Sequence, residues 1–262
     1  MKFKDQVVWI TGASSGLGEA MAKGFNAEGA KVILSARNVQ ELARVQATFS
    51  NPSTPSVILP FDVQKYHEAE ARAAEALKAF GKIDILVNNA GLSQRSLAKD
   101  TPFAEELKII EVDLIGTIAL TKAVLPEIMR QKGQIVVISS VMGKINTKYR
   151  TTYAAAKHGV VGYFESLRLE MLEEGVNILN IMPGFIATNI TKNAVGTTAD
   201  VIKNSQNNLG LTPEAFAEQA LVAIHRRKGN AYIGGFKEWA AMLIKRLSPA
   251  LFDRFIVKQK VT

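Results

Sequence analysis

The chain has 262 residues, 47% hydrophobic and 21% charged, a composition typical of a globular protein with one large core. It contains no cysteine, which excludes disulfides, thiolate metal sites and a cysteine nucleophile, and which suits a reducing compartment such as the cytoplasm. The first residues, MKFKDQVVWITG, lack a long apolar segment, so we expect no signal peptide. No apolar run approaches the ~18 residues of a membrane-spanning helix.

The formal net charge of +8 is concentrated near the C-terminus. Residues 226–262 carry nine basic and two acidic side chains, a net charge of +7, which leaves +1 for the first 225 residues. A nucleic-acid groove would need basic residues across the domain itself, so we expect no nucleic-acid partner.

Short apolar runs alternate with longer helical patterns along the chain. Strands are predicted at residues 6–12, 31–36, 56–62, 83–91, 133–140, 176–184 and 230–235. Helices are predicted near residues 17–29, 39–49, 66–80, in a long segment ending near 129, at 151–174 and near 213–227. The strands are continuously apolar, as in a parallel sheet covered on both faces. The pattern predicts a single α/β domain, a Rossmann-like doubly wound parallel sheet with helices on both faces.

The segment TGASSGLG follows the first predicted strand and opens the first predicted helix. Glycines there let the backbone approach a pyrophosphate at the positive end of the helix dipole. A tight strand–helix turn without a ligand is the other interpretation, but the strand before and the helix after favour nucleotide binding. The candidate contacts are Gly12, Ser14, Ser15, Gly16, Leu17 and Gly18.

Tyr153 and Lys157, in TTYAAAKHG, are four residues apart and therefore share one face of a predicted helix. A phenol in water loses its proton only near pH ~10, and a nearby cation such as Lys157 favours the phenolate. Tyr153 can then exchange a proton with an alcohol or an alkoxide. The alternative is a core tyrosine beside a solvated lysine, which an isolated pair with this spacing would indicate.

Several motifs, in order along residues 3–235, together resemble the short-chain dehydrogenase/reductase family. They are TGxxxGxG, NNAG at Asn88–Gly91, ISS ending thirteen residues before Tyr153, and MPGFIAT at Met182–Thr188. The resemblance implies an oxidoreductase that interconverts a carbonyl and a secondary alcohol with a nicotinamide cofactor. Tyr153 would be the acid/base, Ser140 would hold the substrate oxygen, and Lys157 would also bind the nicotinamide ribose. Further implied cofactor contacts are Asp62, Val63, Asn89, Ala90, Gly91, Pro183, Gly184, Ile186 and Thr188.

The end of the second predicted strand, LSARN, addresses the choice of cofactor. NAD-preferring relatives place an acidic residue where this chain has Ala36, which Arg37 follows. A missing carboxylate removes repulsion of a 2′-phosphate, and a guanidinium can pair with that phosphate. The alternative for Arg37 is an exposed arginine at a strand end. We expect NADP(H), with Ser14 as a further contact.

Asp113 is a departure from the family, which usually has asparagine at this position of the active-site set. The asparagine kinks its helix and helps to hold a water in a proton relay toward the lysine. An ionised aspartate only accepts hydrogen bonds, so the amide's donor bonds are lost. We expect Asp113 to keep the helix geometry at lower catalytic efficiency. A cofactor-binding scaffold or redox sensor with little turnover is the alternative function.

The polar segment of residues 185–211 follows the sixth predicted strand, and we expect this long loop to cover the substrate. No charged cluster in the sequence demands an acidic or phosphorylated substrate. We therefore expect the carbonyl or alcohol to sit on a small apolar or lipid-like body. Three scattered histidines, His67, His158 and His225, form no metal-binding pattern, so no metal site is predicted.

Residues 236–262 are predicted as a basic, amphipathic helical extension beyond the domain of residues 1–235. Ser248 and Pro249 suit a helix N-cap and first helical position. Such helices either lie on an anionic membrane surface or pack on the substrate loop or a second subunit, and we favour packing. Family habit implies a homodimer or a homotetramer.

Overall fold

A parallel sheet of seven strands forms the centre of the computed structural model, which describes residues 1–188, 190, 194–196 and 210–257. The strand order is β3-β2-β1-β4-β5-β6-β7. The strands are β1 (Val7–Thr11), β2 (Lys31–Ser35), β3 (Ser56–Ile58), β4 (Ile85–Asn88), β5 (Gln134–Ile138), β6 (Asn177–Pro183) and β7 (Asn230–Ile233). The chain winds outward from β1 in both directions, which confirms the predicted Rossmann-like doubly wound fold.

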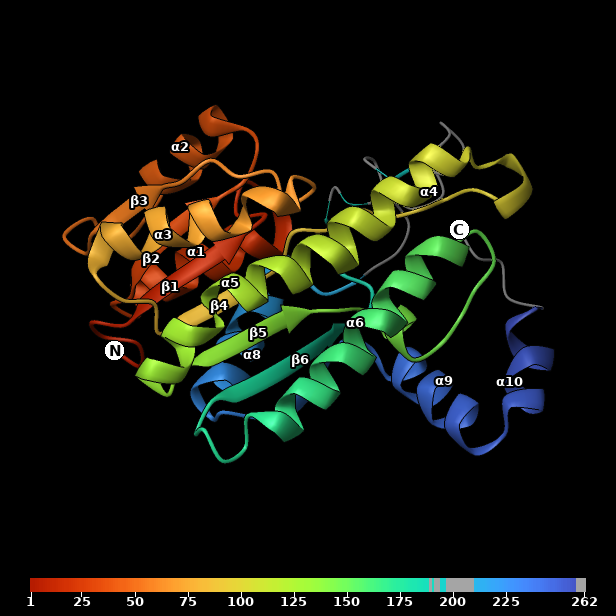
Figure 1. Ribbon diagram of the computed structural model, residues 1–262. Coiled ribbons are helices and arrows are strands. Elements are labelled where there is room, and N and C mark those ends of the chain that lie inside the picture. The colour runs from red at the N-terminus through yellow and green to blue at the C-terminus, as the bar shows by residue number, and fades with distance from the viewer. Residues whose placement is uncertain (189, 191–193, 197–209, 258–262) are drawn as a thin grey trace.

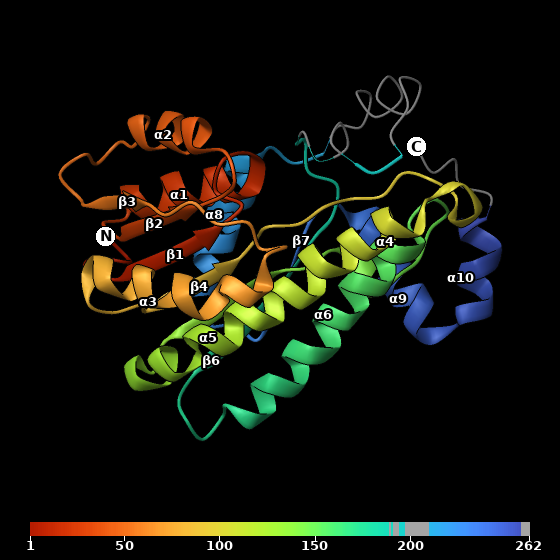
Figure 2. The ribbon, with the colours of Figure 1, turned by 45° about the horizontal axis from the view of Figure 1, so that its top comes forward.

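Helices cover both faces of the sheet (Figures 1 and 2). One face carries α1 (Gly16–Ala27), α2 (Val39–Ala47) and α8 (Pro213–His225), and the other carries α3 (Ala69–Phe80), α5 (Gly116–Gln131) and α6 (Thr151–Glu170). Successive strand side chains enter opposite cores: Val8 and Ile10 pack toward α1, whereas Val7 and Trp9 pack on the other face. Because both faces are covered, the strands are mostly apolar, and nearly all of their polar residues stand at strand ends.

The long helical segment before β5 is interrupted near its middle. Helix α4 (Phe103–Ile110) runs into a π-helical turn, η3 (Glu111–Ile115), which continues as α5. Such wide turns are frequent at functional sites. This one places Asp113, which is 1% exposed, on the inner side of the segment. At its end, Gly116 lies so close to the Val63 carbonyl that a Cβ would be 2.2 Å from that oxygen.

The predicted element boundaries differ most from the structure at β3 and α6, by four residues each. Strand β3 ends at Ile58, because the chain after it leaves the sheet and contributes Phe61 and Val63 to the face covered by α3. Helix α6 ends at Glu170, because a turn that includes Gly175 (φ +72°) starts the return to β6.

The C-terminal helices α9 (Phe236–Leu247) and α10 (Pro249–Ile256) pack beside the segment that follows β5. Ala241 and Phe252 are buried against Val141 and Ile145 in a small third core. Pro249 begins α10 as predicted, while the Ser248 side chain makes no capping hydrogen bond. None of the helices in the described ranges is long and apolar enough to cross a bilayer.

Candidate active site

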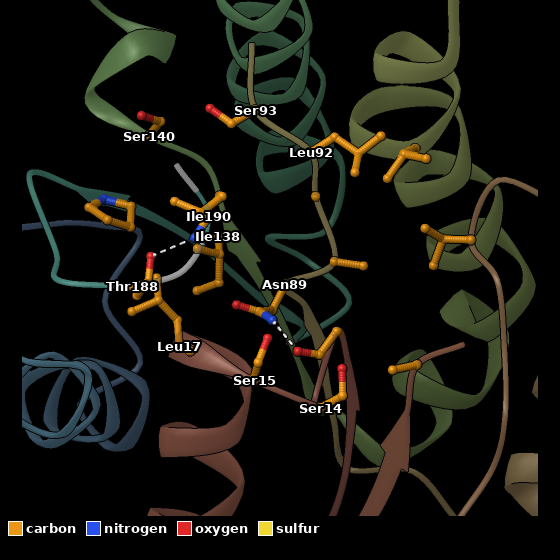
Figure 3. A pocket seen from close by; sticks show the side chains of 18 of the residues that line it. Ser14, Ser15, Leu17, Asn89, Leu92, Ser93, Ile138, Ser140, Thr188 and Ile190 are labelled. Atoms are coloured by element: carbon orange, nitrogen blue, oxygen red, sulfur yellow. Dashed lines mark hydrogen bonds between the residues drawn. The ribbon is translucent and has the colours of Figure 1, made fainter. Parts of the chain in front are cut away.

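A cavity of about 390 Å³ opens at the carboxyl ends of the strands, where ligands bind in doubly wound folds. All the predicted site residues except Gly18 and Asp113 line it: Gly12, Ser14, Ser15, Gly16, Leu17, Arg37, Asp62, Val63, Asn89, Ala90, Gly91, Ser140, Tyr153, Lys157, Pro183, Gly184, Ile186 and Thr188. Figure 3 shows Ser14 and Ser15 near one end, with Ser93 and Ser140 near the other. The cavity therefore spans from the glycine-rich turn to the tyrosine.

Other lining residues were not predicted as site residues: Ala36, Asn38, Phe61, Leu92, Ser93, Val112, Ile138, Ser139 and Ile190. Most of these residues are next in the chain to predicted site residues at strand ends. Extending each predicted motif by one or two residues would have included them. Most of the loop predicted to cover the substrate lies outside the described residues.

The glycine-rich turn accepts no side chain at two positions. Gly12 has φ +65°, and a Cβ on it would lie 2.9 Å from the Cα of Ala90. A Cβ on Gly18 would lie 2.2 Å from the carbonyl oxygen of Gly12. Gly18 thus allows the turn to pack tightly from behind, while Gly12 leaves backbone open toward the cavity.

Hydrogen bonds fasten this turn to the end of β4. The Thr11 hydroxyl accepts from the backbone N–H groups of Asn89 and Ala90, each at 3.1 Å. The Asn89 amide donates back to the carbonyl oxygens of Thr11 (2.9 Å) and Gly12 (3.1 Å). Asn89 therefore braces the turn in addition to lining the cavity.

A second brace reaches the turn from helix α2. Arg44 donates to the carbonyl oxygen of Ser14 (3.2 Å) and to both oxygens of Glu19 (3.0 and 2.8 Å). Hydrogen bonds from Arg44 lower the pKa of Glu19 to about 2, against the opposing effect of burial, and Lys23 adds to the lowering. The arginine is thus held by an acid that stays ionised well below neutral pH.

The Glu19→Gln variant should lose stability in a pH-dependent way. The pKa of Glu19 in the folded chain lies below the ordinary glutamate value of 4.5, so the carboxylate stabilises the fold fully above that pH. This contribution is lost as the pH falls toward 2. Thermal unfolding should show Glu19→Gln about 2–4 °C below the unsubstituted chain at pH 7, with the gap closing in acid. The matched control is Glu75→Gln, which removes a carboxylate from an exposed ion pair with Arg72 and should leave the Tm at pH 7 unchanged. If Glu19→Gln still lowered the Tm by the same amount at pH 2, the ionised Glu19 carboxylate would not be the source of the stability.

Tyr153 and Lys157 lie on α6, and both are buried at the cavity wall. The Lys157 ammonium is 5.7 Å from the centre of the Tyr153 ring and donates to the carbonyl oxygen of Ile138 at 3.3 Å. It also lies 3.2 Å from Oδ2 of Asp113, within ion-pair distance. The other oxygen of Asp113 accepts from the Leu92 N–H at 2.6 Å.

Asp113 and Lys157 therefore form a buried ion pair behind the cavity wall. Burial raises the pKa of the Asp113 carboxyl, although Lys157 and the Leu92 N–H act in the opposite direction. Burial alone would lower the pKa of the Lys157 ammonium, but the negative charge of Asp113, with a further electrostatic contribution from Tyr153, outweighs burial and raises this pKa. Lys157 is thus held as a cation beside the tyrosine. An asparagine at position 113 would not supply this charge.

The two serines after β5 have different tasks. The Ser140 hydroxyl accepts from the Met142 N–H at 3.1 Å, which leaves its own hydrogen to be donated into the cavity. The buried Ser139 donates to the carbonyl oxygen of Lys157 at 3.3 Å and so connects the strand to α6. Ser139 therefore supports the strand, and it also adjoins the cavity.

At the opposite end, Ala36 is buried and Arg37 is exposed on the cavity rim. Within the described ranges, no carboxylate forms an ion pair with Arg37, and Asp62 is the only acidic residue that lines the cavity. The same part of the chain contains no cluster of three acidic, histidine or cysteine side chains that could hold a metal ion.

Comparisons with known proteins agree with this arrangement. The chain is 38% identical over 267 residues to dehydrogenase/reductase SDR family member 7B of Mus musculus, covering 98% of this chain and 81% of the relative. It is 38% identical over 255 residues to the SDR family protein 7-like of Anopheles gambiae (94% and 80%). By sequence alone, the segments LSQRSLAKDT and AAKHGVVGYFESLRLE look like those of bacterial relatives of member 7B, and the match to member 7B confirms a likeness to these proteins.

Solved structures show the same fold. Levodione reductase superimposes with a TM-score of 0.82 at 28% identity, covering 91% of this chain and 99% of the other. A short-chain dehydrogenase/reductase from Burkholderia phymatum in complex with NAD gives 0.86 at 23% identity, covering 96% of each chain, and supports the fold alone. The model of the short chain dehydrogenase family matches residues 6–198, which include the glycine-rich turn, Ser140, Tyr153 and Lys157. The chain thus belongs to the short-chain dehydrogenase/reductase family of oxidoreductases.

Proposed function

We propose that this chain is an NADP(H)-dependent enzyme that interconverts a carbonyl and a secondary alcohol on a small apolar or lipid-like substrate. The observation that carries the proposal is the position of Ser140, Tyr153 and Lys157 in the same cavity as the glycine-rich turn. Family membership supports an oxidoreductase with a nicotinamide cofactor. The direct test is NADPH oxidation by the purified protein with a panel of aldehydes and ketones.

The cavity fits a dinucleotide. Gly12 and Gly16, both with positive φ, line the cavity where a pyrophosphate would lie, and α1 begins at Gly16. Asp62 and Val63 would hold the adenine, and Lys157 the nicotinamide ribose. Contacts from Ala90, Gly91, Pro183, Gly184, Ile186 and Thr188 would complete the binding site. When bound, the cofactor supplies or accepts the hydride.

The residues of this chain handle the proton. Ser140 would donate its hydroxyl hydrogen to the substrate oxygen and hold it beside Tyr153. Tyr153 would protonate the developing alkoxide in reduction and remove the alcohol proton in oxidation. The cationic Lys157, held by Asp113, stabilises negative charge on the phenol oxygen while that proton is away.

The preference for NADP(H) rests on the rim of the cavity. Ala36 offers no carboxylate to accept from a ribose 2′-hydroxyl, and Arg37 is exposed beside Ser14 in the cavity lining. A guanidinium pairs well with a phosphate, often through two parallel hydrogen bonds.

The Arg37→Gln variant should weaken NADPH binding and leave NADH binding nearly unchanged. Loss of a charge-assisted contact with a phosphate corresponds to about a 10- to 100-fold rise in the Kd for NADPH. Fluorescence titration with the two cofactors measures both values on one sample, and NADH serves as the internal control. An equal effect on both cofactors would contradict the role of Arg37.

A cofactor-binding scaffold or redox sensor of the same fold is the second candidate, because Asp113 replaces the amide that the family usually has. This candidate would be supported if the folded protein bound NADPH but did not oxidise it with any carbonyl of the panel. Ser140, Tyr153 and Lys157 favour the enzyme instead.

We also propose that residues 1–235 form the cofactor-binding domain and that residues 236–262 form an extension that contacts a second copy, in a homodimer or homotetramer. Apolar side chains of α9 and α10 remain exposed: Phe236, Trp239, Leu243, Leu247, Leu251 and Phe255. The basic residues Lys245, Arg246 and Arg254 make an anionic membrane the competing partner. Light scattering after size-exclusion chromatography and sedimentation with anionic vesicles distinguish the two; a monomer that binds no vesicles would contradict both.

A further inference from the structure

Helix α6 begins without a capping side chain of its own. Its N-cap residue is Arg150, which makes no side-chain capping hydrogen bond. The backbone N–H groups of Thr152 and Tyr153 lie in the first turn, where no carbonyl oxygen of the same helix can accept from them. A serine, threonine, aspartate or asparagine at the N-cap commonly supplies the missing oxygen. Tyr153 therefore stands in a turn that needs an acceptor from elsewhere in the fold.

Gln94, in the loop after β4, supplies this acceptor. Its side-chain oxygen accepts from the N–H groups of Thr152 (2.9 Å) and Tyr153 (3.3 Å). Its amide nitrogen donates to the hydroxyls of Thr151 (3.2 Å) and Thr101 (3.3 Å). The side chain is fully buried, and both donor hydrogens and both acceptor positions of the amide are used. An amide fits this place, because an apolar side chain of the same length could make none of these bonds.

The backbone on either side of Gln94 is itself held. Gln94 and Val195 form an isolated parallel bridge. The Val195 N–H donates to the carbonyl oxygen of Ser93, and the Arg95 N–H donates to the carbonyl oxygen of Val195, each at 2.8 Å. The amide of Gln94 is therefore presented to α6 from a fixed backbone.

The same loop also holds Lys157, through Asp113. The Leu92 N–H donates to Oδ1 of Asp113 at 2.6 Å, and Oδ2 of that carboxylate lies 3.2 Å from the Lys157 ammonium. Two residues later in the chain, Gln94 holds the N–H of Tyr153. Leu92 lines the cavity, so this loop is at once a wall of the cavity and the support that sets where Tyr153 and Lys157 stand in it.

We propose that Gln94 is a positioning residue for catalysis: by capping α6, it fixes the Tyr153 hydroxyl relative to the substrate oxygen that Ser140 holds. The cavity lining includes its neighbour Ser93 but not Gln94, so Gln94 acts through the helix and touches neither substrate nor cofactor. A displacement of about 1 Å at a reacting group can lower a rate about 100-fold. The inference rests on the proposed function and deepens it by adding a residue that places its acid/base.

Three variants test the proposal. Gln94→Met keeps the length of the side chain and removes all four hydrogen bonds of the amide. Gln94→Glu keeps an oxygen that accepts from the helix N–H groups, at a helix end where a negative charge is favourable. The matched control is Gln46→Met, because Gln46 donates to the carbonyl and hydroxyl oxygens of Ser56 at 3.1 and 2.9 Å, between α2 and β3 and outside the cavity lining.

Single-turnover oxidation of NADPH with the best carbonyl of the panel gives a rate constant and an amplitude. Gln94→Met should lower the rate constant about 10- to 100-fold at full amplitude, and Gln94→Glu should recover most of the loss. Gln46→Met should change the rate constant by less than about twofold, and all three variants should keep the Kd for NADPH within about twofold. A merely structural role would instead lower the amplitude at an unchanged rate constant, because fewer molecules would be folded.

Amide hydrogen exchange followed by NMR measures the cap without turnover. N–H groups in the first turn of a helix exchange rapidly unless a partner protects them. The N–H groups of Thr152 and Tyr153 should therefore be protected in the unsubstituted chain and lose this protection in Gln94→Met. Those of Val160 and Val161, in the middle of α6, should stay protected in both chains.

The two measurements together decide the role of Gln94. Lost protection with an unchanged rate constant would overturn the proposal, and so would a fall in amplitude alone. A Gln94→Glu chain as slow as Gln94→Met would also overturn it, because the acceptor oxygen would then not be what matters. Protection that depends on Gln94 as expected, in a protein that oxidises no NADPH with any carbonyl, would instead contradict the proposed function alone.

Discussion

Replacing Tyr153 by phenylalanine should lower kcat about 10³-fold or more while leaving NADPH affinity nearly unchanged. A positioned acid/base group contributes about 10²- to 10⁴-fold to catalysis, and this variant removes the hydroxyl while retaining the ring. The ring is buried between the cations of Arg150 and Lys157 on a helix whose start is held by Gln94. The loss should therefore come from proton transfer and not from a change of fold.

Single-turnover oxidation of NADPH with the best carbonyl of the panel measures the effect of Tyr153→Phe on the chemical step. Tyr163→Phe is the matched control, because it removes a hydroxyl from the same helix at a ring that packs against Phe164, outside the cavity. The control should retain near-full turnover. If Tyr153→Phe also retained it, another group would have to be the acid/base and the assignment would be wrong.

Replacing Lys157 by methionine should destabilise the fold as well as stop turnover. The side chains of Lys157 and Asp113 are 6% and 0% exposed, so the substitution leaves a carboxylate buried without its cation. Breaking a buried ion pair in this way costs about 3–5 kcal/mol in the free energy of unfolding. Urea unfolding monitored by circular dichroism measures the loss, and NADPH titration reports on the ribose contact.

A second substitution separates the ion pair from other effects of Lys157. In the chain that carries Lys157→Met, the further change Asp113→Asn removes the buried charge and keeps an oxygen that can accept from the Leu92 N–H. The double variant should therefore lose much less stability than the sum of the two single variants. Strict additivity would show that the 3.2 Å contact carries no net coupling.

The same Asp113→Asn change, made alone, tests the departure from the family. The amide regains donor hydrogen bonds for a proton relay, but it removes the negative charge beside Lys157. A rise in kcat would show that the relay matters more, a fall would show that the ion pair does, and an unchanged kcat would show that the departure is harmless.

The parts of the site that depend on short spacing could be predicted from the sequence. The glycine-rich turn needs only a strand, a helix and glycines between them, and Tyr153 and Lys157 share a helix face because they are four residues apart. Their positions in one cavity follow from the strand ends of a doubly wound sheet.

The contacts that the sequence could not predict join distant positions. Asp113 was recognised as unusual, but its ion pair with Lys157 depends on how the π-helical turn packs against α6. Gln94 gives no sign in the sequence that its side chain holds the start of that helix.

The most direct measurement is transfer of deuterium from NADPH labelled at C4 to the carbonyl panel, followed by mass spectrometry of the alcohols. We expect an alcohol one mass unit heavier, with the label on its carbinol carbon, from the unsubstituted chain and none from Tyr153→Phe. A folded protein that binds NADPH tightly but labels no product, with neutral or with anionic carbonyls, would contradict the proposed enzyme and favour the scaffold.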